Sequence, residues 1–151
     1  SMGSLSAVQE REMIDRYITG RPLETITPVC TQEEMAKLQE ECREIYVHAD
    51  LRGYIVKLVQ GTRKYGEGLG EDRGITEGVS PRGTLALLRA SQGYAMVEGR
   101  DFVAPEDIKT VAVPVLAHRM ALDSGFAEEK TAAIRGLLNS VALPTEDWTK
   151  P

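Results

Sequence analysis

The residues whose types and spacing most clearly suggest a binding function are Ser80, Pro81 and Arg82. They open a helix that is expected to end at Gly99. Serine at the N-cap and proline at the first helical position are a typical helix start. Arg82 then lies in the first turn, where free backbone amides favour an anion. A guanidinium beside such amides could clamp a phosphate, because it offers two parallel hydrogen bonds. The alternative is a solvated arginine that the weak helix dipole tolerates.

Complete catalytic motifs are absent from the sequence. Gly61 and Gly66 have the spacing of a P-loop glycine pair, but glutamate and glycine follow where that motif needs lysine and then serine or threonine. No apolar strand ends in Asp-Glu to hold magnesium, and no G-x-S-x-G, H-E-x-x-H or EF-hand sequence occurs. We therefore expect this chain to have no active site of its own.

The histidines and cysteines do not indicate a metal site. His48 and His118 lie far apart in the sequence, and neither has a metal-ligating residue at the right spacing on its own helix face. Cys30 and Cys42 form neither a C-x-x-C pair nor a disulfide framework. We expect surface or helix-capping histidines, inert thiols and no bound metal.

Length and composition predict one globular domain. The chain has 151 residues, of which 42% are hydrophobic and 27% charged, and its formal net charge is −5. This acidic balance argues against a non-specific nucleic-acid binder, and no apolar stretch approaches the ~20 residues of a membrane span. No signal peptide is visible, residues 1–6 have the character of a disordered expression scar, and the cytoplasm is the expected location.

Hydrophobic periodicity indicates an all-α fold, a helical bundle of about five to six helices. A helix over 7–18 is followed by a linker, 22–30, that is expected to lie extended over the core. Thr31 and Glu34 have the spacing of a capping box that opens the next helix. The following helix, 49–64, carries an apolar face made of Leu51, Tyr54, Ile55, Leu58, Val59 and Thr62.

The second half of the chain has three more expected helices. The glycine-rich stretch 66–78 predicts a loop without regular structure. The helix that follows Ser80 is expected to bury Leu85, Leu88, Ala95 and Met96. Pro105 begins another helix, with two acids in its first turn, and a last amphipathic helix covers about 127–141.

Residues 78–120 resemble the sensor-2 region and lid helices of the MoxR family of AAA+ ATPases. The matching motifs, in order, are Val-Ser-Pro-Arg, Leu-Ala-Leu-Leu-Arg-Ala, Gly-Arg-Asp-Phe-Val-Ala-Pro-Glu-Asp-Ile and Val-Leu-Ala-His-Arg. Residues 54–59, with Thr62 and Arg63, are similar to the family's first lid helix. Residues 10–12 and 26–29 resemble its segment between ATPase core and lid, so the resemblance covers about 8–143.

The resemblance implies a fragment of a longer ATPase that binds ATP and Mg²⁺ through an absent α/β core. Arg82 would be the sensor-2 arginine that contacts the terminal phosphates, and Ser80 and Pro81 would shape its turn. Tyr54 and Leu58 are weaker candidates for an adenine wall, with ordinary core positions preferred. Arg63 matches the family without a defined role.

The implied organisation has four parts, and the implied partners follow from it. A connecting helix and linker span 7–30, the helical lid spans 31–143, and a C-terminal tail spans 144–151. The partners would be the protein's own AAA+ core, the neighbouring subunits of a ring, and von Willebrand factor A domain proteins. Arg82 could serve its own or a neighbouring subunit's nucleotide.

Two other classes of function stay open at this point. Residues 103–108 also resemble the last helix of histone folds, which would make the chain a nucleic-acid-binding module. The absence of a cationic stripe counts against that interpretation. A helical protein-interaction module without a nucleotide role is the other alternative, and in it the Ser80–Arg82 turn would be incidental.

Overall fold

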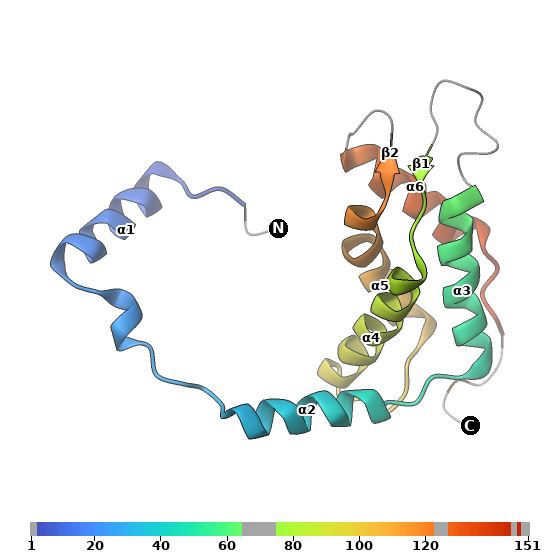
Figure 1. The fold of residues 1–151 in the computed structure, drawn as a ribbon, viewed down its shortest axis with the longest axis horizontal. Coiled ribbons are helices and arrows are strands. Elements are labelled where there is room, and N and C mark those ends of the chain that lie inside the picture. Colours follow the sequence, from blue (N-terminus) through green and yellow to red (C-terminus); the bar gives the residue numbers. More distant parts are fainter. Residues whose placement is uncertain (1–2, 65–74, 123–126, 146–147, 149–151) are drawn as a thin grey trace. The chain divides into compact units, whose positions relative to one another are not determined.

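The computed structural model of the chain describes residues 3–64, 75–122, 127–145 and 148. This part is dominated by α-helices, which confirms the all-α class (Figure 1). The helices are α1 (Ala7–Thr19), α2 (Gln32–Glu44), α3 (Ala49–Lys64), α4 (Pro81–Val97), α5 (Pro105–Leu116) and α6 (Ala127–Ser140), with 3-10 helices η1 (Pro22–Thr25) and η2 (Ala117–Arg119). Two short strands, β1 (Ile75–Glu77) and β2 (Ala121–Leu122), pair antiparallel. None of the described helices is long and apolar enough to cross a membrane.

The chain divides into two compact units, residues 1–36 and 37–151. In the first unit, α1 begins with a capping box in which the Ser6 and Gln9 side chains each accept from the other residue's backbone N–H. The linker prediction is wrong for η1, because Pro22 starts a helical turn instead of an extended segment. Considered within this unit, three apolar side chains of the linker are exposed: Leu23, Ile26 and Val29.

Helix α2 starts as the sequence predicts. The Glu34 backbone N–H donates to Thr31 Oγ1 over 3.1 Å, and the Thr31 N–H donates to Glu34 Oε2 over 2.7 Å. These bonds satisfy two of the amides that a helix start leaves without partners. At its other end, the Gln92 side-chain amide donates to the carbonyls of Arg43 and Ile45, which caps α2 from α4.

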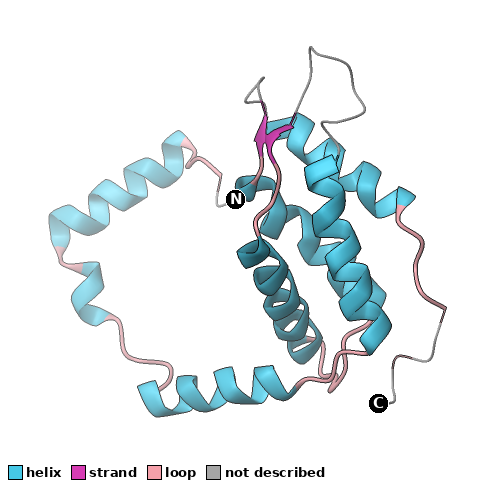
Figure 2. Cartoon of the chain, turned by 45° about the vertical axis from the view of Figure 1, so that its right-hand side comes forward, coloured by secondary structure: helices cyan, strands magenta, loops and turns pink. Residues whose placement is uncertain are grey.

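Helices α3 to α6 build the hydrophobic core of the second unit. The buried face of α3 consists of the six residues that the sequence predicts, and α4 and α5 pack closely against each other, which Figure 2 shows from a second angle. The core also includes residues from the other three helices and from the segments between them: Val79, Leu87, Ala95, Val103, Ile108, Ala112, Leu116, Met120, Ala133 and Ile134.

The glycine in the last turns of α3 marks a close helix–helix contact. A Cβ on Gly61 would lie 2.8 Å from Leu137 Cδ2 of α6, closer than real Cβ atoms come to their neighbours. Glycine therefore leaves room for the Leu137 side chain against the end of α3, at a cost of about 1 kcal/mol for a glycine in a helix interior.

Two expectations for the middle of the chain need correction. Leu85 is 63% exposed, and the buried face of α4 instead contains Leu87 and Ser91. Residues 75–77 form a strand rather than loop, because they pair with β2. Residues 66–74 of the predicted loop lie outside the described residues.

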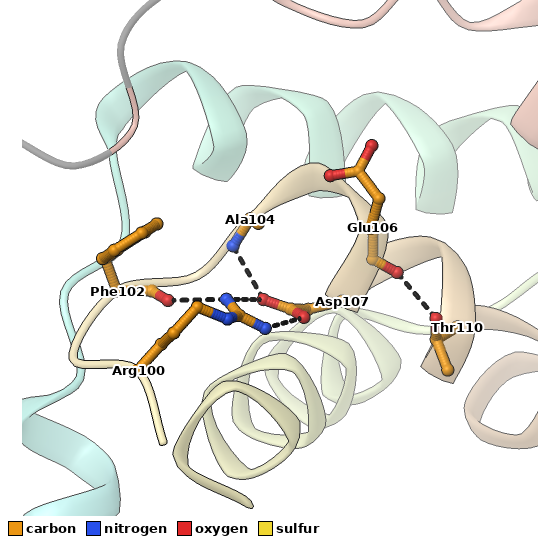
Figure 3. Close-up of polar contacts among 6 residues, drawn as sticks. All are labelled: Arg100, Phe102, Ala104, Glu106, Asp107 and Thr110. Atoms are coloured by element: carbon orange, nitrogen blue, oxygen red, sulfur yellow. Dashed lines mark hydrogen bonds and ion pairs between the residues drawn. The ribbon is translucent and has the colours of Figure 1, made fainter. Parts of the chain in front are cut away.

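The corner between α4 and α5 is held by a forked ion pair (Figure 3). Arg100 Nη1 and Nη2 donate to Asp107 Oδ2 and Oδ1 over 2.7 and 2.5 Å, and the Ala104 N–H donates to the same carboxylate. The Asp107 side chain is 2% exposed, so its charge is compensated inside the protein. The hydrogen bonds to Asp107 raise the pKa of Arg100. Arg100, Ala104 and Asp107 of the Gly-Arg-Asp-Phe-Val-Ala-Pro-Glu-Asp motif thus take part in a structural contact.

The hydrogen bonds of the capping box that opens α2 should weaken at acidic pH. Hydrogen bonds from the Thr31 backbone and hydroxyl lower the pKa of Glu34 below its ordinary value of 4.5. When the pKa of a carboxyl group is lower in the folded chain than in the unfolded chain, the ionised group stabilises the folded state at pH values above the unfolded pKa. This stabilisation is lost as the pH falls through the lowered, folded-state pKa. The Thr31 amide resonance should therefore shift in an acid titration followed by NMR. Glu34→Gln should abolish the shift and Glu33→Gln should keep it; a shift that survives Glu34→Gln would contradict the assignment.

Loss of one partner of the Arg100–Asp107 ion pair should destabilise the fold more than replacement of both partners by apolar residues. Arg100→Met leaves the Asp107 carboxylate buried without its cation and should lower the free energy of unfolding by about 3–5 kcal/mol. The double variant Arg100→Met/Asp107→Leu should recover much of that loss, because no buried charge remains. Urea unfolding of both variants measures this. Equal losses in the single and double variants would show that the charge is not the cause.

Candidate functional site

Helix α4 begins as the sequence predicts, with Ser80 at the N-cap and Pro81 at the first helical position. The Ser80 backbone is extended, with φ −70° and ψ 166°, and its carbonyl accepts from the Gly83 N–H over 2.8 Å. Its side chain makes no capping hydrogen bond. Pro81 has no N–H and the Gly83 N–H is already bonded, so the Arg82 N–H is the amide of the first turn that the Ser80 hydroxyl leaves to another acceptor.

The Arg82 side chain is exposed at the second position of α4. Within the described part of the chain, no residue forms a hydrogen bond or ion pair with it. Helix α4 also has no acidic residue in its first turn, whereas each of the other described α-helices has one or two. An uncompensated guanidinium at the positive end of a helix is an environment that favours a multiply charged anion.

The segment that leads into α4 is anchored to the end of α3. The Val79 N–H donates to Thr62 Oγ1 over 3.0 Å, and the Val79 carbonyl accepts from Arg63 Nε over 2.8 Å. Thr62 and Val79 are fully buried, and the Thr62 hydroxyl donates in turn to the Val59 carbonyl over 2.6 Å. Both polar groups of the Val79 backbone are thus held by two consecutive residues of α3.

Glycine is required beside this anchor. A Cβ on Gly78 would lie 2.6 Å from Arg63 Cα and 2.9 Å from the Arg63 backbone nitrogen, so the two backbones are in direct contact. No side chain fits between them without moving one of the segments. Sequence patterns give no sign of Gly78, Thr62 or Val79 as parts of the site, because their interactions join positions that lie far apart in the sequence.

The two candidates for an adenine wall lie in the core. Tyr54 is 1% and Leu58 2% exposed, which agrees with the preferred interpretation of both as ordinary core residues. Burial raises the pKa of the Tyr54 hydroxyl, and the Glu106 carboxylate adds to this. The Tyr54 hydroxyl is buried without a hydrogen-bond partner among the described residues.

The histidines and cysteines take separate places. His48 Nδ1 accepts from the Asp50 N–H, and the His48 ring packs edge-on against Trp148. His118 bonds to the Pro114 carbonyl, and both cysteines are free thiols. In the described ranges no three metal-ligating side chains come together.

Comparisons with known proteins find a matching family model and relatives that align with most of this chain. The family model described as AAA lid domain matches residues 70–135. The uncharacterized protein YeaC of Bacillus subtilis is 33% identical over 96% of this chain, and Chaperone MoxR1 of Mycobacterium tuberculosis is 33% identical over 95%. These matches cover 44% and 39% of the relatives, so the chain spans less than half of their length.

A solved structure is also similar over most of this chain. The crystal structure of a candidate ATPase from Cytophaga hutchinsonii matches 95% of this chain and 45% of its own length, with a TM-score of 0.76 and 26% sequence identity.

The buried anchor at Val79 should be essential for stability. Thr62→Val replaces the hydroxyl with a methyl group of similar shape and leaves the buried Val79 N–H without an acceptor. We expect the free energy of unfolding to fall by about 1–3 kcal/mol, the cost of an unsatisfied buried donor. Thr62→Ser keeps the hydroxyl and is the matched control in urea unfolding. A larger loss for serine than for valine would mean that packing, not the hydrogen bond, holds the segment.

Proposed function

Because this chain is a MoxR-type AAA lid domain, we propose that it is the nucleotide-sensing lid of a longer AAA+ ATPase. The longer protein would supply the P-loop and the magnesium-binding acids that this sequence lacks, so ATP and Mg²⁺ would be bound mainly outside this chain. Within the chain, residues 7–30 would connect core and lid, 31–143 would form the lid, and 144–151 its tail.

The observation that carries this proposal is the state of Arg82. Its guanidinium is exposed and unpaired among the described residues, at a helix start with no acid in its first turn. The position matches the arginine of the small-Ser-Pro-Arg motif in MoxR lids. We assign Arg82 the role of sensor 2, the contact between lid and terminal phosphates, and assign Ser80 and Pro81 the shaping of the turn.

A lid that senses nucleotide needs different affinities for different nucleotide states. A ligand shifts a conformational equilibrium only by its difference in affinity for the two conformations. The terminal phosphate of ATP provides that difference if Arg82 binds it in only one position of the lid. Hydrolysis and phosphate release would then free the guanidinium and allow the lid to move, which couples chemistry to conformational change.

The partners follow from this assignment. The lid would contact its own AAA+ core and the neighbouring subunits of a ring, and Arg82 would act on one of those nucleotides. The chaperone name of the mycobacterial relative supports a remodelling role. We propose that the assembled ATPase acts in the cytoplasm together with von Willebrand factor A domain proteins as partners.

Replacement of Arg82 tests the proposal. In the full-length ATPase, Arg82→Ala should lower steady-state hydrolysis by up to about 10³-fold, the low end of what arginine contacts supply in phosphoryl transfer. Arg82→Lys should restore little, because lysine lacks the two-pronged geometry. Arg135→Ala, at another exposed arginine, should hydrolyse ATP normally.

A stability measurement separates sensing from structure. In the 151-residue chain, Arg82→Ala should change the free energy of unfolding by no more than about 0.5 kcal/mol, as for an exposed site without partners. Unchanged turnover in the full-length variant would refute the sensor role. A large drop in the melting temperature of the chain would show that Arg82 is structural.

A further inference from the structure

The side chain of Arg63 has a specific partner that the proposed function does not use. It lies in the last turn of α3, exposed on its outer side, and its Nε donates to the Val79 carbonyl over 2.8 Å. Residue 79 immediately precedes the N-cap of α4. Arg63 therefore contacts the backbone three residues before Arg82.

We propose that Arg63 is a positioning residue: it fixes the direction in which α4 begins and so aims Arg82 at the nucleotide phosphates. The proposal rests on the sensor role assigned to Arg82 and adds to it the residue that sets the sensor's orientation. Arg63 acts through the Val79 carbonyl and does not itself touch the nucleotide.

Two hydrogen bonds fix both peptide planes of Val79. The Thr62 hydroxyl holds the N–H on one side of the residue, and Arg63 Nε holds the carbonyl on the other. One bond alone would leave the second plane free to rotate about the Val79 backbone. Because the Val79 carbonyl belongs to the peptide unit that enters Ser80, the Arg63 bond is the one that sets the entry into α4.

Packing carries this orientation into the first turn of α4. The Val79 side chain is fully buried, and its Cγ1 occupies the space where a Cβ of Gly83 would stand. Gly83 follows Arg82 directly, and its N–H bonds to the Ser80 carbonyl. A displacement of Val79 is thus passed to the backbone on both sides of Arg82.

Two substitutions separate the hydrogen bond from the charge of Arg63. Glutamine places its Nε2 at the same number of bonds from the backbone as arginine Nε, so Arg63→Gln keeps a donor for Val79 and removes the charge. Methionine has a methyl group at that position, so Arg63→Met removes both. If Arg63 bound phosphate directly, glutamine and methionine would be equally impaired.

The experiment is steady-state ATP hydrolysis by the full-length protein. Arg63→Met should lower kcat about tenfold, because misplacement of a reacting group by about 1 Å costs up to about 10²-fold and the Thr62 bond limits the displacement. Arg63→Gln should stay within about twofold of the wild type, since its donor is retained. Equal losses for glutamine and methionine, or wild-type turnover of Arg63→Met, would overturn the proposal.

A double variant shows whether the effect passes through Arg82. In an Arg82→Ala background, Arg63→Met should cause no further loss, because residues that act as one unit are not additive. A full additional tenfold loss would mean that Arg63 acts elsewhere and would refute the positioning role. Undiminished turnover of Arg82→Ala alone would instead refute the sensor assignment, so the two failures are distinguishable.

Hydrogen exchange of the 151-residue chain gives a readout without ATP. Arg63→Met should speed exchange of the Gly83 amide, whose bond to Ser80 depends on the entry into α4, and Arg63→Gln should not. The exchange of core amides in α5 should be equal in both variants. Faster exchange throughout the chain would indicate general destabilisation and contradict a local positioning role.

Discussion

The hydrogen bonds that hold the Val79 backbone on the end of α3 are the constraint on which the candidate site depends. They join the end of α3, at Lys64, to the start of α4, at Pro81. Helix packing alone restricts the distance and angle between α3 and α4, but it leaves the residues before a helix free to enter from several directions. The paired bonds remove that freedom at the residue where α4 starts.

Arg100 and Arg82 differ in whether the surrounding residues already bind their guanidinium groups. Arg100 is committed to a buried carboxylate and its bonds close the corner between α4 and α5, so it has little capacity for another ligand (Figure 3). The side chain of Arg82, at the opposite end of the same helix, has no such partner in the described residues. Ala104 and Asp107, in the stretch that resembles the histone fold, thus bond within the protein, whereas the Arg82 side chain has no bond among the described residues.

Local patterns in the sequence predicted the helices well. The buried face of α3 and the caps at Thr31 and Ser80 follow from spacing within a few residues, which is the range that periodicity and capping rules describe. The prediction that Leu85 is buried is wrong, because apolar residues are frequent on both sides of α4 and the position of α5 decides which side is covered.

The parts that were missed depend on contacts between distant positions. The short strands exist because residues 75–77 and 121–122 meet in space, and neither segment carries enough alternation to predict a strand by itself. The anchor of Val79 has the same origin. The sequence could identify Arg82 as a candidate, but only the folded chain shows which residues orient it.

The close contact between Gly78 and Arg63 also has an evolutionary consequence. It brings Arg63 and Gly78, two positions with β1 between them in the sequence, into direct backbone contact. In general, the entropic cost of closing a loop rises only with the logarithm of its length, so a doubling of loop length costs about 0.6 kcal/mol. Insertions of new sequence between Lys64 and Ile75 can therefore accumulate at little thermodynamic expense, while the geometry at the start of α4 stays the same.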